Sequence, residues 1–237
     1  IIVDEAQDLS KTQLEFIKEL YLEDDSSSIM FLYDGAQSIY DQAWIGKKRA
    51  FKSVGFDMSG RVRTLTKNFR TTTQISQAAY SLIRNYESIT SDEHYIEPKL
   101  IDRQGPYPVF KKFDSFHEQI KEIKNLINTD LAKHSKNNIY ITARTTEILR
   151  EAEIALNALG VPSSIVDKET IEFDTDKVKL ITMHSIKGLE SKVVIIISCN
   201  EGILPLYLSH DTDSMKEQEI MDKKLLYVGM TRATEQL

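Results

Sequence analysis

Short apolar runs alternate along this chain with stretches in which apolar residues recur every three or four positions. Runs of the first kind are typical of buried strands, and stretches of the second kind are typical of amphipathic helices. The predicted strands cover residues 1–3, 29–33, 62–66, 139–143, 178–182 and 193–198. The predicted helices cover residues 8–22, 73–86, 115–131, 146–160 and 217–228. This alternation indicates an α/β fold with a parallel sheet.

Terminal signals support two of the helices. Ser115 and Glu118 have the spacing of a capping box, and Gly160 ends the helix that begins at Thr146. A domain boundary is expected in the turn-rich segment 54–60, which divides the chain into residues 1–57 and 58–237.

The composition is that of a globular protein without disulfides. The chain has 237 residues, of which 41% are hydrophobic and 28% charged. Its single cysteine, Cys199, lies in an apolar pattern, which favours a core position and the reducing cytosol. The longest apolar runs, such as 193–197, are far shorter than the ~20 residues that span a bilayer. We therefore expect a cytoplasmic protein with no membrane partner.

The net charge of −6 hides a basic segment. Between Ala43 and Arg70 there is one acid, Asp57, against eight basic residues: Lys47, Lys48, Arg49, Lys52, Arg61, Arg63, Lys67 and Arg70. Such a segment can face a phosphate backbone, and we take Arg61 and Arg63 as candidate DNA-binding residues.

The first predicted strand ends at a group of carboxylates. Asp4 and Glu5 follow it directly, and in α/β NTPases an Asp at a strand end holds Mg²⁺ while a nearby base activates water. The loop pattern G-x-x-x-x-G-K-[ST], which cradles phosphates, does not occur in the sequence. Two other readings stay open: a solvated turn, and a metal-dependent nuclease site built on Asp4, Glu5 and Asp8.

Five segments, in this order, carry a resemblance that single motifs could not. They are residues 4–8 (DEAQD), 35–40 (GAQSIY), 65–71 (LTKNFRT), 181–190 (ITMHSIKGLE) and 225–233 (LLYVGMTRA). Together they resemble motifs II to VI of the UvrD/Rep/PcrA-type superfamily 1 DNA helicases. The resemblance implies two RecA-like domains, with residues 1–57 as the end of the first and 58–237 as the second.

The resemblance also implies roles at an ATP site. Asp4 would bind Mg²⁺, Glu5 would polarise the attacking water, and Gln37 would sense the γ-phosphate. The other implied ATP-site residues are Phe69, which stacks on adenine, the γ-phosphate arginines Arg70 and Arg232, and the nucleotide-lining Lys187, Gly188 and Glu190. Both arginines are expected beside Glu190, on one face at the carboxyl ends of the strands.

Single-stranded DNA is the implied partner, and the bacterial cytosol or nucleoid is the implied location. Tyr40 and Trp44 offer flat faces for stacked bases, and His184 would contact DNA. A core position is the alternative for Trp44, because the family's Trp usually lies closer to that Tyr, and a structural role is the alternative for His184.

The resulting expectation is the C-terminal part of an ATP-dependent DNA helicase or translocase of 3′ to 5′ polarity. An upstream remainder of the same protein would carry the phosphate loop, so this chain alone is expected to be inactive. The rival in a different class is a non-hydrolysing module that binds a partner such as RNA polymerase.

Overall fold

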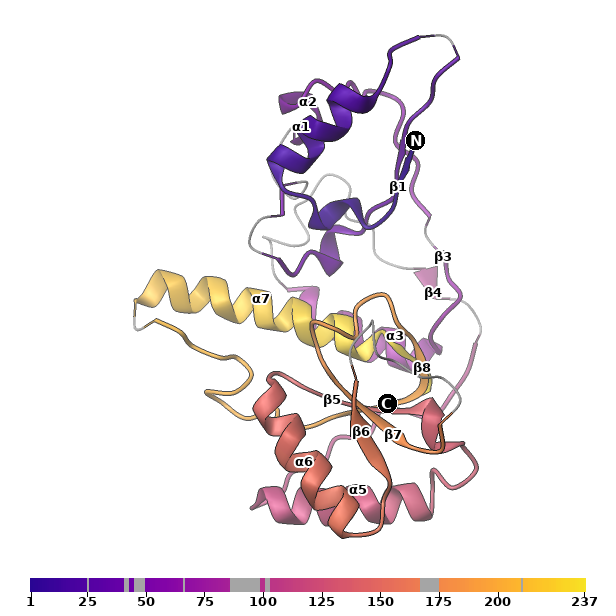
Figure 1. The fold of residues 1–237 in the computed structure, drawn as a ribbon, viewed down its shortest axis with the longest axis vertical. Coiled ribbons are helices and arrows are strands. Elements are labelled where there is room, and N and C mark those ends of the chain that lie inside the picture. The colour runs from indigo at the N-terminus through magenta and orange to yellow at the C-terminus, as the bar shows by residue number, and fades with distance from the viewer. Residues whose placement is uncertain are drawn as a thin grey trace. The chain divides into compact units, whose positions relative to one another are not determined.

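The computed structural model describes residues 1–24, 26–40, 43–44, 50–65, 67–85, 99–100, 103–166, 175–209 and 211–237 (Figure 1). The chain forms two compact units. Unit 1 comprises Ile1–Lys67 and Ile83–Lys99, and unit 2 comprises Asn68–Leu82 and Leu100–Leu237. The chain thus leaves unit 1 after Lys67, later than the expected boundary at residue 57, and returns to it after Leu82.

A parallel sheet forms the centre of unit 2. Among the described residues it has five strands in the order β6-β7-β5-β8-β9. Their bounds are β5 Ile139–Ala143, β6 Ser163–Ile165, β7 Val178–Thr182, β8 Ser191–Ile196 and β9 Ala233–Gln236. All of the pairings are parallel. Every residue of the central strand β5 is buried, as expected where both faces of a sheet are covered.

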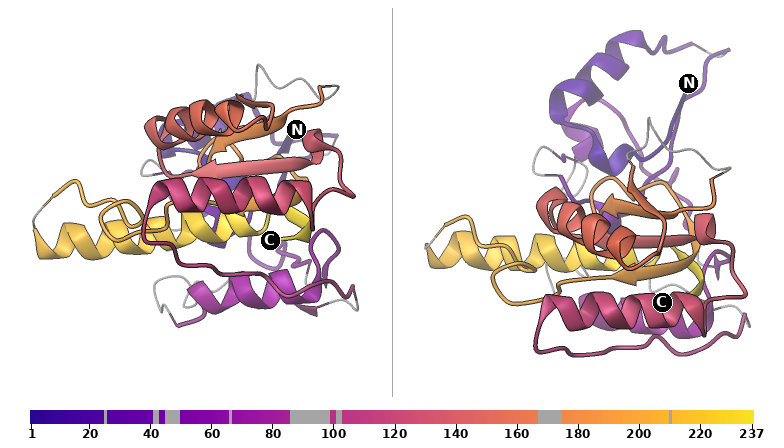
Figure 2. Two further views of the ribbon diagram at one scale, coloured as in Figure 1. Left: turned by 90° about the horizontal axis from the view of Figure 1, so that it is seen from below. Right: turned by 60° about the horizontal axis from the view of Figure 1, so that its bottom comes forward.

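Helices cover both faces of this sheet (Figures 1 and 2). The helices of unit 2 are α3 Thr73–Ile83, α5 Phe116–Asn128, α6 Thr146–Ala158 and α7 Thr212–Met230, with the 3-10 turn η3 Lys136–Asn138 before β5. Apolar residues of α5 and α6, such as Ile123 and Leu149, pack with Ile141 and Leu180 on one face. On the other face Ile75 of α3 packs with residues of β5, β7 and β8.

The connection from β7 to β8 contains no helix. Residues 183–188 run as consecutive turns, and the connection 183–190 leads from the carboxyl end of β7 to the amino end of β8, on the far side of β5. Ile186 is buried there in the same apolar cluster as Ile75. The segment therefore crosses one face of the sheet, and it has candidate site residues both near the carboxyl end of β7 and near the amino end of β8.

Unit 1 is smaller and is held together by aromatic side chains. Its described elements are β1 Ile2–Val3, η1 Ala6–Asp8, α1 Lys11–Leu20, β2 Met30–Phe31, η2 Gly35–Gln37 and α2 Ala50–Ser53. Strands β1 and β2 pair in parallel. The Phe31 ring lies 4.9 Å from that of Phe51 and 5.0 Å from that of Phe56, and Leu14 of α1 is fully buried in the same cluster. The short strands β3 Lys67–Asn68 and β4 Lys99–Leu100 form a further two-stranded sheet.

The α/β class with a parallel sheet is confirmed, and so are the bounds of β5 and β7. The Ser115 cap is also confirmed, since its hydroxyl accepts from the amide of Glu118 at 3.2 Å. The Glu118 carboxylate, however, accepts from the amide of Asp114 instead of closing the box on Ser115.

Several predictions about burial and extent are wrong. Ile2 is 70% exposed, because β1 has only β2 beside it among the described strands. Residues 62–65 are not a strand, and Leu65 is 92% exposed. Helix α7 begins at Thr212 instead of residue 217 because Asp211 caps it. Cys199, three residues beyond the end of β8, is exposed, because the buried segment ends at Ser198.

Candidate functional site

The carboxylates predicted at the first strand lie at a sharp turn of unit 1. Asp4 is exposed, and its Oδ1 accepts from the amide of Glu5 at 2.9 Å. Glu5 has φ 51° and ψ 36°, a left-handed conformation that costs a non-glycine residue about 1–3 kcal/mol and is often found at functional sites. The turn directs two adjacent carboxylates away from the regular strand.

Gln7 connects this turn to the next predicted motif. Its side chain is 1% exposed; Nε2 donates to the Glu5 carboxylate, and Oε1 accepts from the amide of Asp34 at 3.0 Å. The Asp34 carboxylate in turn accepts from Gln37 Nε2 at 2.8 Å. Glu5 and Gln37, both predicted from the sequence, therefore belong to one hydrogen-bonded network.

Tyr40 and Trp44 have different surroundings. Burial, followed by the negative charges of Asp8 and Glu5, raises the pKa of Tyr40, so this half-buried ring lies near the acidic turn. The Trp44 ring packs against the core of unit 1, and its Nε1 donates to Ser53 Oγ at 3.0 Å. The core alternative for Trp44 is thus supported, and its contact with DNA stays a prediction.

The basic segment is described only in part. Arg61 and Arg63 are exposed, so they are available to a polyanion. Lys47, Lys48 and Arg49 lie outside the described residues.

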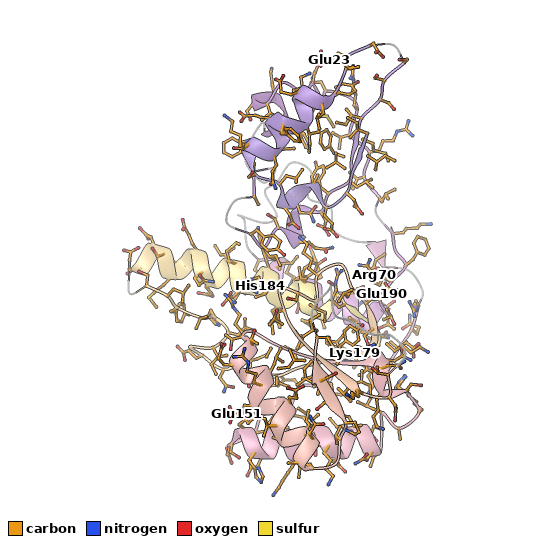
Figure 3. The ribbon with its side chains drawn as sticks, in the orientation of Figure 1. Glu23, Arg70, Glu151, Lys179, His184 and Glu190 are labelled. Atoms are coloured by element: carbon orange, nitrogen blue, oxygen red, sulfur yellow. The ribbon has the colours of Figure 1, made fainter. Side chains whose placement is uncertain are left out.

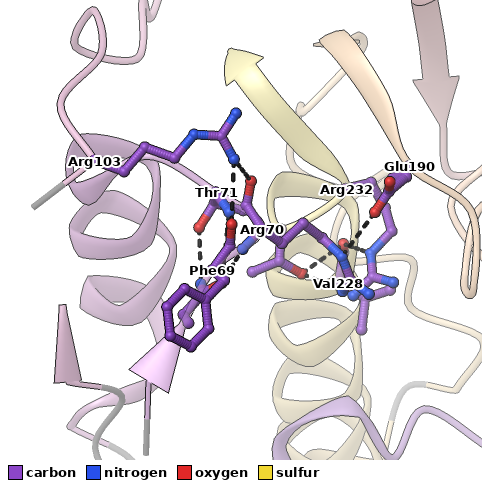
Figure 4. A network of polar contacts seen from close by, with 9 residues as sticks. Phe69, Arg70, Thr71, Arg103, Glu190, Val228 and Arg232 are labelled. Carbon is purple, nitrogen blue, oxygen red and sulfur yellow. Dashed lines mark hydrogen bonds and ion pairs between the residues drawn. The ribbon is translucent and has the colours of Figure 1, made fainter. Parts of the chain in front are cut away.

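In unit 2, Phe69 and Arg70 form a turn ahead of α3 that is fixed from two sides (Figure 4). The Asn68 side chain accepts from the amide of Arg70 through Oδ1 at 2.9 Å, and its Nδ2 donates to Thr71 Oγ1 at 2.8 Å. From the other side, Arg103 Nη1 donates to the carbonyl oxygens of Phe69 and Arg70. The backbone is therefore held while the Phe69 ring remains 70% exposed.

Arg70 forms an ion pair with Glu190, with Nε and Oε2 3.1 Å apart (Figures 3 and 4). Arg232 is 1% exposed, and its Nε donates to the carbonyl of Val228 at 3.2 Å. The amide of Ser191, next to Glu190, donates to the carbonyl of Arg232. Arg70 and Glu190, far apart in the sequence, are therefore paired, and the backbone of Arg232 lies beside the residue that follows Glu190.

Their predicted place on the sheet is wrong. Glu190 and Arg232 immediately precede β8 and β9, whose first residues Ser191 and Ala233 are in register. Both residues therefore lie at the amino ends of parallel strands, not at the carboxyl ends. The reason is the 183–190 connection, which carries Glu190 across the sheet before β8 begins.

The other candidate residues of that connection do not all lie at the amino ends of the strands. His184, half-buried, follows the carboxyl end of β7 and lies apart from the Arg70–Glu190 pair in Figure 3. Lys187 is 2% exposed. Gly188 has φ +84°, a conformation that glycine adopts without strain.

Sequence reasoning missed the residues that hold the site. Gln7 and Asn68 stand inside the quoted motifs, and an amide can donate and accept at once, which is a signal that could have identified them. Arg103 stands in a stretch with no motif, and nothing in the sequence marks it.

Metal binding and membrane insertion can be judged only for the described parts of the chain. There, no group of three or more His, Cys, Asp or Glu side chains could hold a metal ion, so a nuclease site on Asp4, Glu5 and Asp8 has no support. Mg²⁺ bound with substrate phosphates commonly takes one or two carboxylates, which exposed Asp4 fits. None of the described helices has the length and apolarity needed to cross a membrane.

Comparison with known proteins gives a consistent result. ATP-dependent DNA helicase Rep of Buchnera aphidicola subsp. Schizaphis graminum is 38% identical over 115 residues, 44% of this chain and 17% of that protein. ATP-dependent DNA helicase Rep of Escherichia coli K12 is 37% identical over 73 residues, 31% of this chain and 10% of that protein. The matched stretches thus span less than a fifth of either relative.

A solved structure, the C-terminal domain of a possible DNA helicase from Lactobacillus plantarum WCFS1, aligns with a TM-score of 0.47 and 20% identity over 72% of this chain and 84% of that one. The model of the family described as UvrD-like helicase C-terminal domain matches residues 63–174 and 167–237. That match includes Arg70, Glu190 and Arg232, and the chain belongs to the UvrD-like helicase C-terminal domain family.

Proposed function

We propose that this chain is the C-terminal part of an ATP-dependent DNA helicase or translocase that moves 3′ to 5′ on single-stranded DNA in a reducing cytosol. The observation that carries the proposal is the convergence of Arg70, Glu190 and Arg232 from three distant segments. Arg70 pairs with the Glu190 carboxylate, and the backbone carbonyl of Arg232 accepts from the residue next to Glu190. Two arginines and a carboxylate in this arrangement would suit the phosphates and the ribose of a nucleoside triphosphate. Residues 1–57 would then belong to a first RecA-like domain and 58–237 to a second.

The chain's residues divide the work of hydrolysis. Asp4 would hold Mg²⁺, which neutralises charge on the β- and γ-phosphates when bound. Glu5 would accept a proton from the attacking water, a role that needs hydrogen-bond reach. Gln37 would sense the γ-phosphate and report it to the DNA side of the unit.

Unit 2 would supply the stabilising charge. A fixed arginine at a phosphoryl transition state contributes about 10³–10⁵ in rate, and Arg70 and Arg232 are the candidates. Phe69 would stack on adenine with its exposed ring, Glu190 would accept from the ribose hydroxyl, and Lys187 and Gly188 would line the site. The ion pair with Glu190 uses Nε of Arg70, and the Nη groups of the same guanidinium would be the donors to a phosphate.

DNA would be bound by stacking and by charge. The candidates are Tyr40, Trp44, His184, Arg61 and Arg63. Of these, the exposed Arg61 and Arg63 and the half-buried Tyr40 have the most support from their surroundings. A non-hydrolysing binding module is the competing proposal, and no contact among the described residues specifically favours it.

The decisive experiment uses a longer protein that contains this chain and a phosphate loop. DNA-stimulated ATP hydrolysis should be lost in Glu5→Gln, while nucleotide binding is retained, because the substitution removes the base and keeps the shape. Glu19→Gln, an exposed carboxylate on α1, is the matched control and should behave as wild type. Hydrolysis that survives Glu5→Gln would refute the assignment of the base, and absence of hydrolysis in the unmodified protein would favour the binding module.

A further inference from the structure

Gln7 has hydrogen-bond partners at both ends of its side-chain amide, and the proposed function assigns it no role. Its amide is buried, with Nε2 donating to the Glu5 carboxylate and Oε1 accepting from the amide of Asp34. Its backbone carbonyl also accepts from Ser38 Oγ at 3.4 Å. A buried amide in a core must be satisfied on both ends, and here both ends contact candidate motifs.

The orientation of this amide follows from its partners. The backbone N–H of Asp34 can only donate, so the oxygen of Gln7 must face it. The nitrogen of Gln7 must then face Glu5, which accepts as a carboxylate. The same residue therefore restrains the candidate base and fixes the turn that begins at Asp34.

The network continues to the candidate phosphate sensor. The Asp34 carboxylate accepts from the amide of Ala36 at 3.0 Å and from Gln37 Nε2 at 2.8 Å. A displacement of Gln37 would pull on Asp34, and Asp34 is bonded to Gln7. The path from Gln37 to Glu5 thus consists of three consecutive hydrogen-bonded steps.

The left-handed backbone of Glu5 explains why such a restraint is needed. At φ 51° and ψ 36° the residue is not held by a helix or a strand, so neighbouring contacts must fix its side chain. The base function requires its carboxylate to stay within hydrogen-bond reach of a water.

We propose that Gln7 is a positioning residue, which holds the Glu5 carboxylate in its working orientation and couples that orientation to Gln37 through Asp34. This inference rests on the proposed function, in which Glu5 is the base. It assigns Gln7 no contact with nucleotide or metal.

Two substitutions separate positioning from support of the turn. Gln7→Leu removes both side-chain bonds at similar volume. Gln7→Glu keeps an acceptor for the amide of Asp34 but removes the donor to Glu5 and adds a charge. Gln7→Leu thus tests the two bonds together, whereas Gln7→Glu tests the donor to Glu5 with the Asp34 bond in place.

The kinetic test uses the longer protein with saturating single-stranded DNA. Both variants should lower kcat by roughly 10²-fold, the scale of a misplaced catalytic group. The KM for ATP should stay within about threefold of wild type, because Gln7 is assigned no contact with the nucleotide. Gln13→Leu, which changes an exposed glutamine of α1 that caps the helix, is the control and should retain wild-type kcat.

A second readout needs no activity. In the nucleotide-free 237-residue chain, the backbone amide resonance of Asp34 should shift and exchange faster in Gln7→Leu but stay near its wild-type position in Gln7→Glu. Thermal unfolding of each variant shows whether it is folded. If Gln7→Leu does not fold, the kinetics of Gln7→Glu alone test the positioning role of Gln7.

The outcomes distinguish a failure of this inference from a failure of the proposed function on which it rests. If Glu5→Gln stops turnover but Gln7→Glu has wild-type kcat, Gln7 only supports the turn and the inference is overturned. A rise in KM at unchanged kcat would overturn it as well. If Glu5→Gln leaves turnover intact, the proposed base is wrong, whatever Gln7 does.

Discussion

At the scale of single residues, motifs identify the side chains that can carry chemistry, but not the ones that hold them. Arg70 and Glu190 could be predicted from their motifs, and they form an ion pair. Arg103, which fixes the backbone of Arg70, could not, because its partners are carbonyl oxygens and any residue provides those. The pattern of a sequence records side-chain chemistry, whereas such contacts depend on how the chain folds back.

Arg70 and Arg232 should differ in what their loss does to the fold. Arg70 and Glu190 have side chains that are 44% and 62% exposed, and exposed pairs contribute about 0–1 kcal/mol. Arg70→Ala should therefore leave the free energy of unfolding of the chain nearly unchanged. In the longer protein it should lower ATP turnover by roughly 10³-fold or more if the arginine meets the transition state.

Arg232→Ala should impair both properties. The buried guanidinium donates to the Val228 carbonyl and to Thr231 Oγ1, and an acceptor left without its donor costs about 1–3 kcal/mol. Urea denaturation of the chain and steady-state ATPase assays of the longer protein measure the two effects. Equal destabilisation by both substitutions would contradict the different burial of the two arginines.

At the scale of elements, the sequence predicts best where burial alone sets the pattern. Strand β5 was predicted with its observed ends because all five of its residues are buried. The segment 62–66 is also rich in β-branched residues, yet its described residues 62–65 are exposed and form no strand. It has only two apolar residues and includes Arg63, so it lacks the continuous apolar run of β5 that burial on both faces requires.

Helix α7 shows the second limit, because a buried charge holds it to other elements. The Asp222 carboxylate accepts from Arg144 Nε at 3.1 Å, from the amide of Leu206 at 2.7 Å and from Gln218 Nε2 at 3.1 Å. It thereby joins α7 to the end of β5 and to the segment that follows β8. The sequence showed an acid among lysines, which is typical of a solvated helix face.

We predict that Asp222→Ala destabilises unit 2 strongly. The side chains of Arg144 and Asp222 are 14% and 3% exposed, and removing one partner of a buried pair costs about 3–5 kcal/mol. Asp213→Ala on the same helix, where the side chain is 91% exposed, is the control and should change stability by less than about 0.5 kcal/mol. Urea denaturation curves of the two variants test this, and similar midpoints would contradict the structural role of Asp222.

At the scale of the whole molecule, the net charge of −6 does not decide whether the chain binds DNA, because binding depends on the local positive charge of exposed arginines. Binding of single-stranded DNA should weaken as salt rises, with a slope of about −0.7 in log K against log salt per phosphate neutralised. Replacing both Arg61 and Arg63 with Ala should make that slope shallower by about 1.4 if each meets one phosphate. Fluorescence anisotropy titrations with oligothymidine at several salt concentrations measure it.

Tyr40→Ala provides the matched comparison. Loss of a stacked base costs about 1–3 kcal/mol, so affinity should fall while the salt slope stays the same. Binding that is insensitive to salt and to Tyr40→Ala would instead favour a protein partner over DNA.

The chain by itself should not hydrolyse ATP. Phosphoryl transfer in P-loop NTPases requires backbone amides and a Lys around the β- and γ-phosphates, with a Ser or Thr hydroxyl on Mg²⁺. The sequence has no G-x-x-x-x-G-K-[ST] loop to provide them, although it has the acidic turn at Asp4 and Glu5 and the arginines of unit 2. Phosphate release by the 237-residue chain should therefore stay at background with and without single-stranded DNA, while the longer protein is stimulated by it. DNA-stimulated release by the chain alone would mean that its own residues form the phosphate site, and the assignment of Arg70 and Arg232 as partners of a separate loop would have to be abandoned.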